Sequence, residues 1–324
     1  MAKEAARHRI AEVVESANEF RNPMVLVPAL SFLTFSLEDV EKVHEGLAEA
    51  GSLKFFDSRH DVLAYQKEGG TVLFFSYECL AWGKVGPDAE QLAAMRQSVV
   101  EVASLYQLSL DSIFVWLDCL SVPQANRAAR QAAISSICLY AAVSDFMIIA
   151  CPNSVHASTL EKADSESIKR RFWCRLEQVV FGCLQGTGKM HLHRGRELEV
   201  LPDGWMDSIC CVYESNTSCC RQRHAGFSGC DRETAVTPLL TFFSDVYWRA
   251  TTSGQATEKD LYAWDLICRH RHRMFPKTFR FTSSAGEQQE EQEEERVLFG
   301  SFAQDIERLL PASRPAARQP WGIA

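Results

Sequence analysis

The sequence has 324 residues and a formal net charge of -8, from 34 basic and 42 acidic side chains. This acidic balance argues against a protein built to lie on nucleic acid or on anionic lipid. With 46% hydrophobic and 23% charged residues, the composition is that of a globular protein, and the length predicts one core domain with substantial flanking structure.

The first 20 residues carry charge throughout and lack the apolar centre of a secretory signal, so they predict an amphipathic surface helix. Nowhere does an apolar run reach the length of about 18 residues that a membrane span needs. The twelve cysteines lack the spacing of a small disulfide-bonded domain. These features predict a soluble, cytoplasmic protein with mostly reduced thiols and no membrane partner.

Residues 1–69 are expected to form a helical segment that packs on the core. Within it, the apolar run at 24–30 is a strand candidate. Ser36 opens a predicted helix that has acidic residues in its first turn and ends at Gly51.

Residues 70–205 show a regular alternation of strands and helices. The predicted strands are apolar nearly from end to end, which is the pattern of a parallel sheet covered by helices on both faces. The fold class is therefore predicted to be α/β, with a doubly wound parallel sheet. The strands are expected at 71–77, 112–118, 145–150 and 198–201, and the helices at 88–107, 127–142 and 171–184.

Beyond residue 205 the pattern weakens, and residues 206–285 are expected to form a helical extension with helices at 232–249 and 258–269. The last segment, 286–324, begins with a glutamate-rich tract at 287–295, which is predicted to be a solvated linker or the start of a short final helix. A disordered tail is expected after Leu310.

The basic run from Arg269 to Arg280 is interleaved with Phe275, Phe279 and Phe281. Such a run could grip phosphate or RNA. The acidic tract that follows closely favours neutralisation within the chain instead, so no nucleic-acid partner is predicted.

Ligands of doubly wound sheets collect outside the carboxyl ends of the strands. The segment RRFWCRLEQ opens the helix after the third strand, and its Trp173 and Glu177 are four residues apart and share a helix face. The positive end of this helix favours an ionised carboxylate. An alternative is a solvated face on which Glu177 pairs with nearby arginines while Trp173 is core, and the segment alone favours that alternative. The arginines in question are Arg170, Arg171 and Arg175.

Four segments together resemble Toll/interleukin receptor (TIR) domains over about 130 residues. They are TVLFFSY, VWLDCLSVPQ, FMIIACPNS and WCRLE, and they follow one another in the order of the TIR strands and motif. A closer likeness is to a TIR-like, heterokaryon-incompatibility-like group of microbial eukaryotes, which carries Ser-His-x-Trp-Leu after the first strand. Here that segment is SYECL, with Tyr77 and Cys79 in place of the histidine and the tryptophan.

The resemblance implies a flavodoxin-like fold and, in its catalytic members, a glutamate that contacts the ribose of NAD and helps to break the bond to nicotinamide. Glu177 is the matching residue. NAD would then be a substrate and no cofactor is expected. Ser76, Tyr77, Asp118 and Trp173 are the candidate substrate-binding neighbours. Packing or capping at the strand ends is the alternative for each of them, and it is favoured for Asp118.

The sequence is compatible with two functions. One is a TIR-like NAD glycohydrolase in stress or self-recognition signalling, and the intact WCRLE favours it. The other is a non-catalytic interaction module that self-associates, and the altered SYECL favours that one. A homo-oligomer through the TIR-like domain is a possible partner arrangement in both.

The remaining candidates are soft ligands and histidines. A cysteine-rich stretch offers enough ligands for zinc, but its adjacent cysteines lack Cys-x-x-Cys spacing, so buried or loop thiols are favoured and no metal site is predicted. His191 and His193 are predicted to be surface residues. No glycine-rich phosphate loop occurs. The six candidate metal ligands of the cysteine-rich stretch are Cys210, Cys211, Cys219, Cys220, His224 and Cys230.

Overall fold

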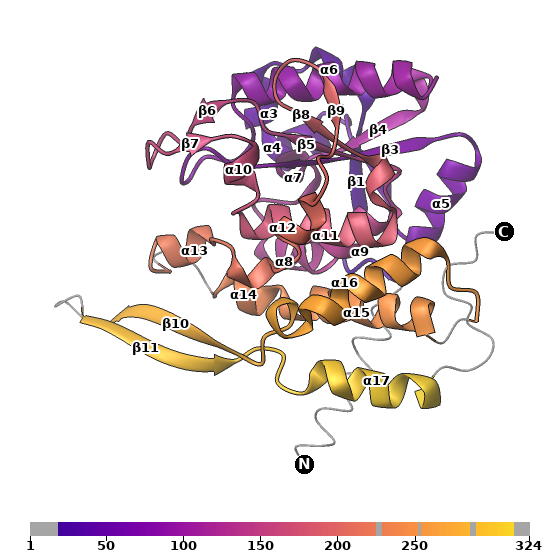
Figure 1. Ribbon diagram of the computed structural model, residues 1–324. Coiled ribbons are helices and arrows are strands. Elements are labelled where there is room, and N and C mark those ends of the chain that lie inside the picture. The colour runs from indigo at the N-terminus through magenta and orange to yellow at the C-terminus, as the bar shows by residue number, and fades with distance from the viewer. Residues whose placement is uncertain (1–18, 225–228, 252–253, 286–289, 314–324) are drawn as a thin grey trace. The chain divides into compact units, whose positions relative to one another are not determined.

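The computed structural model (Figure 1) describes residues 19–224, 229–251, 254–285 and 290–313. The predicted N-terminal helix at residues 1–20 lies outside this range except for residues 19–20, which are not helical. The disordered tail predicted after Leu310 also lies outside it, except for residues 311–313, which are helical and not disordered. The chain divides into two compact units. One consists of residues 20–210, and the described part of the other comprises Glu19 and the described residues from Cys211 onward.

The first unit is built on a seven-stranded sheet with the strand order β2-β1-β4-β3-β5-β8-β9. The four central strands, from β4 to β8 in that order, are parallel, whereas β1, β2 and β9 pair antiparallel with their neighbours. The strands are β1 (Met24–Pro28), β2 (Lys54–Phe56), β3 (Thr71–Tyr77), β4 (Ile113–Trp116), β5 (Phe146–Ala150), β8 (Met190–His193) and β9 (Leu198–Val200).

The predicted α/β class is confirmed, and the sheet is mixed and largely parallel. All residues of β3 and β5 are buried, as their continuous apolar sequences predict. The sheet begins at Met24, so the segment before residue 70 contributes strands as well as helices. The fourth parallel strand is β8, which alternates polar and apolar residues, and the predicted strand near Leu198 is its antiparallel hairpin partner.

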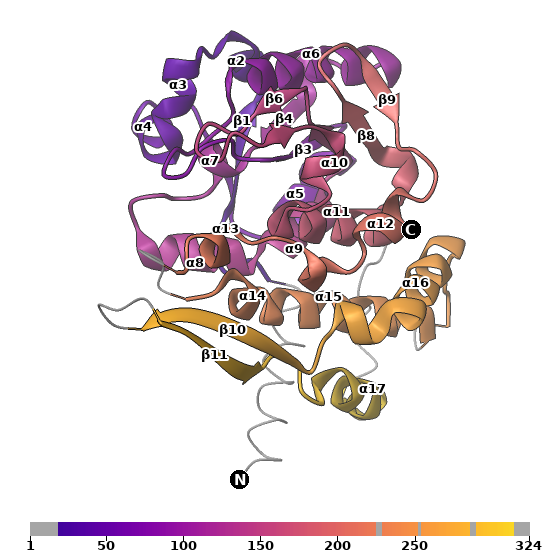
Figure 2. The ribbon, with the colours of Figure 1, turned by 60° about the vertical axis from the view of Figure 1, so that its left-hand side comes forward.

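Helices cover both faces of this sheet (Figure 2). Helices α2 and α6 lie on one face, and α5, α9 and α11 lie on the other. The helices of the unit are α2 (Ala29–Thr34), α3 (Leu37–Glu41), α4 (Val43–Glu49), α5 (Arg59–Lys67), α6 (Ala89–Leu105), α7 (Asp118–Ser121), α8 (Arg127–Ser135), α9 (Ile137–Val143), α10 (Ser165–Ile168), α11 (Phe172–Leu184) and α12 (Trp205–Ile209). Short elements are η1 (Leu110–Ser112), η2 (Thr187–Lys189), β6 (Ser154–Val155) and β7 (Lys162–Ala163).

Two predicted helices are each divided in the structure. The helix expected from Ser36 to Gly51 breaks between α3 and α4, because Val43 has a φ of 50°, outside the helical region. The helix expected from Arg127 breaks at Ser136, which separates α8 from α9. Helices α6 and α11 agree with their predictions to within two residues.

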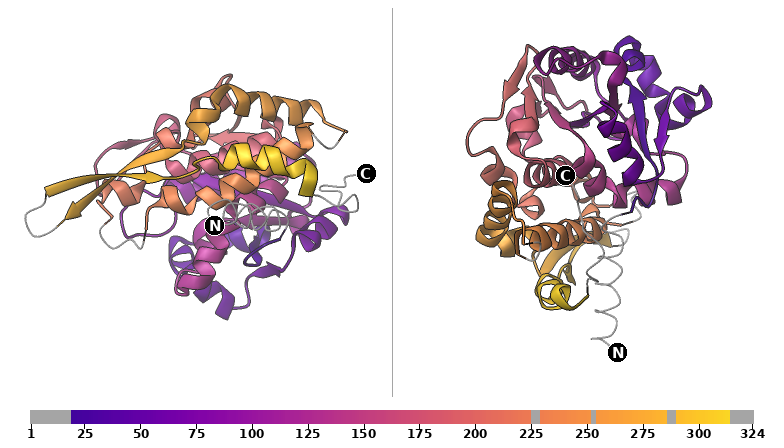
Figure 3. Two further views of the ribbon diagram at one scale, coloured as in Figure 1. Left: turned by 90° about the horizontal axis from the view of Figure 1, so that it is seen from below. Right: turned by 90° about the vertical axis from the view of Figure 1, so that its right-hand side faces the viewer.

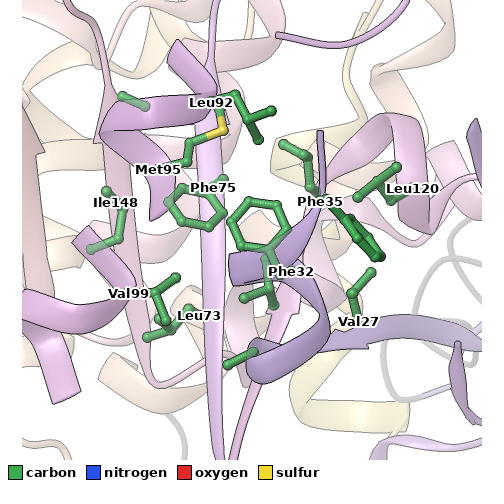
Figure 4. Packing of buried hydrophobic residues seen from close by; sticks show 14 of the residues in the cluster. Val27, Phe32, Phe35, Leu73, Phe75, Leu92, Met95, Val99, Leu120 and Ile148 are labelled. Carbon is green, nitrogen blue, oxygen red and sulfur yellow. The ribbon is translucent and has the colours of Figure 1, made fainter. Parts of the chain in front are cut away.

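One hydrophobic core fills the space between the sheet and the helices α2 and α6 (Figure 4). Phe32 of α2 stacks on Phe75 of β3, with ring centroids 5.7 Å apart. Met95 and Val99, from successive turns of α6, face the same strand and are fully buried. This core holds β3 in place along its length.

The second unit contains helices and one β-hairpin. Its elements are η3 (Val212–Glu214), α13 (Ser218–Arg221), α14 (Asp231–Thr234), α15 (Val236–Thr251), α16 (Glu258–Met274), β10 (Thr278–Ala285), β11 (Glu290–Val297) and α17 (Phe302–Ser313). Helix α15 packs against α16 and α17.

The hairpin β10–β11 corrects the prediction for the glutamate-rich tract. Residues 290–295 of that tract are neither linker nor helix but most of strand β11, which pairs antiparallel with β10 over eight residues (Figure 3). In this register Arg280, the last residue of the basic run, lies opposite Glu295, the last residue of the acidic tract. This one cross-strand pair of opposite charges favours the register.

Three arginines of the basic run form ion pairs within the chain, but with acids outside the tract that was predicted to neutralise it. Arg271 pairs with Glu307 at 2.7 Å, and Arg273 makes two bonds of 2.6 Å to Glu214.

Within the described residues, each helix is too short or too polar to cross a membrane.

Candidate functional site

Glu177 projects from α11 toward the carboxyl end of β3. Its side chain is buried, with the residue only 7% exposed, and its Oε2 accepts a hydrogen bond of 2.7 Å from Oγ of Ser76. Cys174, three residues earlier, contacts the backbone oxygen of Tyr77. The predicted pair of Ser76 and Glu177 therefore meets at the end of this strand, and the alternative of a solvated glutamate is wrong.

Ser76 is one link in a directed chain of hydrogen bonds. The indole N–H of Trp205 donates to Oε1 of Gln178 at 3.0 Å, and Nε2 of Gln178 donates to Oγ of Ser76 at 3.3 Å. Ser76 in turn donates to Glu177. Because Gln178 and Ser76 each receive one hydrogen bond and give another in the same direction, the chain polarises toward the carboxyl group. Gln178 and Trp205 were not among the predicted site residues.

Burial dominates the protonation of Glu177. It raises the pKa of this carboxyl well above its usual range, the hydrogen bond from Ser76 opposes the shift, and the negative charge of Asp118 adds to it. The environment therefore favours the protonated, neutral form of Glu177. A cation placed beside the carboxyl would favour ionisation.

Tyr77 and Asp118 form a second pair at the same edge. The hydroxyl of Tyr77 donates to Oδ1 of Asp118 at 2.8 Å, and the same oxygen accepts from the backbone N–H of Cys119 at 2.6 Å. Burial raises the pKa of Asp118, while these two hydrogen bonds lower it. Asp118 thus accepts a backbone hydrogen bond at the start of α7, in keeping with its expected local structural role, and also binds the tyrosine.

Trp173 lies one turn before Glu177 on α11 and is only half-buried. Its ring lies edge-on to that of Phe172, with centroids 5.5 Å apart. The two residues that the spacing placed on one helix face therefore differ in environment: Glu177 is enclosed, and Trp173 retains access to solvent.

Glu78 is an acidic residue of this edge that the sequence reasoning did not single out. It follows β3 directly, accepts a hydrogen bond of 2.6 Å from Oγ of Ser167, and lies 3.6 Å from Nε of Arg171. Arg171, expected as a partner of Glu177, thus pairs with Glu78. The signal was present in SYECL, where a glutamate stands next to the tyrosine at the strand end.

His191 and His193 were predicted to be surface residues. They are instead buried in β8. β8 pairs with β5 on one edge and with β9 on the other, and α6 packs against it. His191 lies 2.9 Å from the hydroxyl of Tyr106, and His193 lies 3.6 Å from Glu101. Burial lowers the pKa of both imidazoles.

The cysteine-rich stretch is partly gathered in the second unit. Ligand atoms of four of its six residues lie within 4.8 Å of one another. These are Cys219, Cys220, His224 and Cys230, here called the Cys–His cluster. Spacing along the chain gave no signal for this convergence, since the ligands come from a short helix, the turn after it and the residue before α14.

Comparisons with family models, with curated proteins and with solved structures find no match to this chain. The α/β sheet and the buried polar groups at the end of β3 are therefore the features that bear on function.

Proposed function

We propose that residues 20–210 form a TIR-like domain of flavodoxin-like topology. The order of the parallel strands supports this: along the chain they are first β3, then β4, β5 and β8, and in the sheet they run second, first, third, fourth. Flavodoxin-like sheets share this order and bind ligands where it reverses, between the first and third strands. Ser76 and Tyr77 end the first of these strands, at that position.

The function that we propose is hydrolysis of NAD at the bond between nicotinamide and ribose, in intracellular signalling or self-recognition. The observation that carries it is the carboxyl of Glu177, buried at the end of β3 with a chain of hydrogen bonds directed toward it. A carboxyl held in this way is aimed before any ligand arrives, which is what stabilisation of a developing charge requires.

The chemistry needs one ionised carboxylate. The bond between C1′ of the ribose and N1 of nicotinamide breaks with its electron pair moving to the nitrogen, so that a cationic pyridinium leaves as a neutral base. The sugar becomes oxocarbenium-like, and a carboxylate stabilises it as in glycosidases. Water then adds to C1′ and releases a proton. The positive charge of bound NAD beside Glu177 would favour the ionised form that this step uses.

The other predicted residues would position the substrate. Ser76 orients the carboxyl of Glu177. Trp173, half-buried one turn earlier, offers an aromatic face to a base or to nicotinamide. Tyr77 and Asp118, bonded to each other, lie where β3 ends and α7 begins.

The test is release of nicotinamide from NAD by the purified full-length protein, measured by mass spectrometry at several protein concentrations. Glu177→Gln keeps the shape and the acceptor for Ser76 but cannot ionise, so turnover is expected to fall by at least about 100-fold. Glu90→Gln, at an exposed acid in the first turn of α6, is the matched control and should retain full activity.

The pH profile sharpens this test. Because burial raises the pKa of Glu177, the rate should rise with pH through that pKa as the carboxylate form becomes available. Unchanged NAD at high protein concentration, or equal rates for wild type and Glu177→Gln, would remove the enzymatic proposal.

A second candidate is a non-catalytic module that assembles into homo-oligomers. It is favoured by one observation: Tyr77 and Asp118 bond to each other, and Ser76 both donates and accepts, so these polar groups are satisfied without a ligand. Light scattering on the same samples separates the candidates, since assembly without turnover, unaffected by Glu177→Gln, supports the module alone.

A further inference from the structure

The Cys–His cluster lies in the second unit, apart from the residues of the proposed function. Cys219 and Cys220 are neighbours on α13, and His224 sits in the turn that follows this helix. Cys230 immediately precedes α14. The turn brings the histidine back over the helix, because the backbone N–H of His224 donates to the carbonyl of Cys219 at 2.7 Å.

The distances within the cluster are those of a tetrahedral metal site. Sγ of Cys220 lies 3.6 Å from Sγ of Cys230 and 3.5 Å from Nε2 of His224, and the sulfurs of Cys219 and Cys230 are 4.0 Å apart. Zinc bonds of about 2.3 Å to sulfur and about 2.0 Å to nitrogen, at tetrahedral angles, separate two sulfurs by about 3.8 Å and a sulfur from a nitrogen by about 3.5 Å.

Two further groups donate to the sulfurs. The backbone N–H of Asp231 donates to Sγ of Cys219 at 3.3 Å, and Nη1 of Arg232 donates to Sγ of Cys220 at 3.1 Å. Nη2 of Arg232 also donates to the carbonyl of Ser215 at 2.7 Å, which fixes the guanidinium. Such outer donors are typical of metal-bound thiolates. Arg232 also offsets the single negative charge that three thiolates and one imidazole leave on a divalent ion.

Aromatic side chains of β10 cover the cluster. Phe281 is buried against Cys219 and Cys230, and its ring stacks on that of His224 with centroids 4.2 Å apart. The guanidinium of Arg232 lies 4.4 Å from the ring of Phe279. The hairpin thus packs on the cluster through two side chains on alternate residues of one strand.

We propose that the Cys–His cluster binds one Zn²⁺ as a structural site that fastens the β10–β11 hairpin to the segment between α13 and α14. Three sulfurs and one imidazole complete a tetrahedral shell, so no position remains for a reacting water. Soft thiolates with imidazole select zinc over hard cations such as magnesium or calcium. The site therefore organises structure and does not take part in turnover.

The first test is the metal content of the full-length protein, expressed with zinc and purified under reducing conditions. We expect the double variant Cys220→Ser, Cys230→Ser to contain one equivalent of zinc less than wild type. Cys268→Ser removes an exposed thiol of the same unit and should leave the zinc content unchanged.

The second test uses the wild-type chain alone, so it does not depend on how the variant folds. After zinc is removed, added Co²⁺ should give the intense visible bands of a tetrahedral ion together with sulfur-to-cobalt charge-transfer absorption, and zinc should displace both. A weak, octahedral cobalt spectrum, zinc content equal in the double variant and wild type, or a disulfide among the three cysteines in peptide maps would overturn the proposal.

Discussion

The two units hold their functional candidates by different means. In the first, Ser76 sits on β3, whose residues are all buried, and Glu177 sits on α11, most of whose apolar side chains are buried as well. In the second, the small cluster around Phe281 consists largely of thiols. The first candidate site is held by apolar packing, whereas the hairpin of the second unit packs on a cluster whose sulfurs we propose to bind zinc.

The strongest test of this contrast is Phe75→Ala. Phe75 is fully buried in β3 and stacks on Phe32, so its truncation leaves a cavity behind the strand that carries Ser76. We expect the free energy of unfolding of the first unit to fall by about 3–5 kcal/mol. Hydrogen exchange of peptides from β3 and β5 measures this change.

Leu30→Ala is the control for Phe75→Ala, since Leu30 is an exposed apolar residue of the neighbouring helix α2. Its effect should stay within about 0.5 kcal/mol. If a chelator weakened β3 as much as Phe75→Ala does, the first unit would also depend on metal and the contrast would fail.

The second prediction concerns stability and pH at Glu177. The folded-state pKa is raised by burial, so the folded chain holds this proton more tightly than the unfolded chain does. The resulting stabilisation is complete below the unfolded pKa of about 4.3 and is lost as pH rises through the folded pKa. Glu177→Gln cannot ionise and escapes this loss. Its free energy of unfolding relative to wild type should therefore increase with pH in denaturant titrations.

Glu90→Gln again serves as the control, and its difference from wild type should stay flat over the same range. A flat difference for Glu177→Gln would mean that the carboxyl is solvated and ionises freely in the folded chain.

The sequence predicted the sheet well where strands are buried on both faces. TVLFFSY is apolar between Thr71 and Ser76, and FMIIA is apolar throughout. Helical spacing identified α6 and α11 to within two residues. β8 was missed because its sequence, MHLH, alternates like a surface strand. Its histidines find partners in Tyr106 and Glu101, which lie far away along the chain.

The site was predictable in part for the same reason. Helical spacing and strand ends placed Glu177 near Ser76, and Tyr77 near Asp118. The contribution of Gln178 and Trp205 depends on where α12 packs against α11, which local sequence does not encode. Likewise, the Cys–His cluster depends on two turns, and its ligand spacing matches no regular zinc motif.

The smallest expected effect comes from an ion pair on the surface of the second unit. Arg273 and Glu214 make a two-bond contact between α16 and η3, but their side chains are 45% and 46% exposed. Arg273→Gln should lower the free energy of unfolding by no more than about 1 kcal/mol, and 1 M salt should remove the difference. Removal of zinc from the wild-type chain should increase exchange of the hairpin far more. If Arg273→Gln instead loosened β10 as much as chelation does, surface charge rather than the sulfurs would hold this unit together.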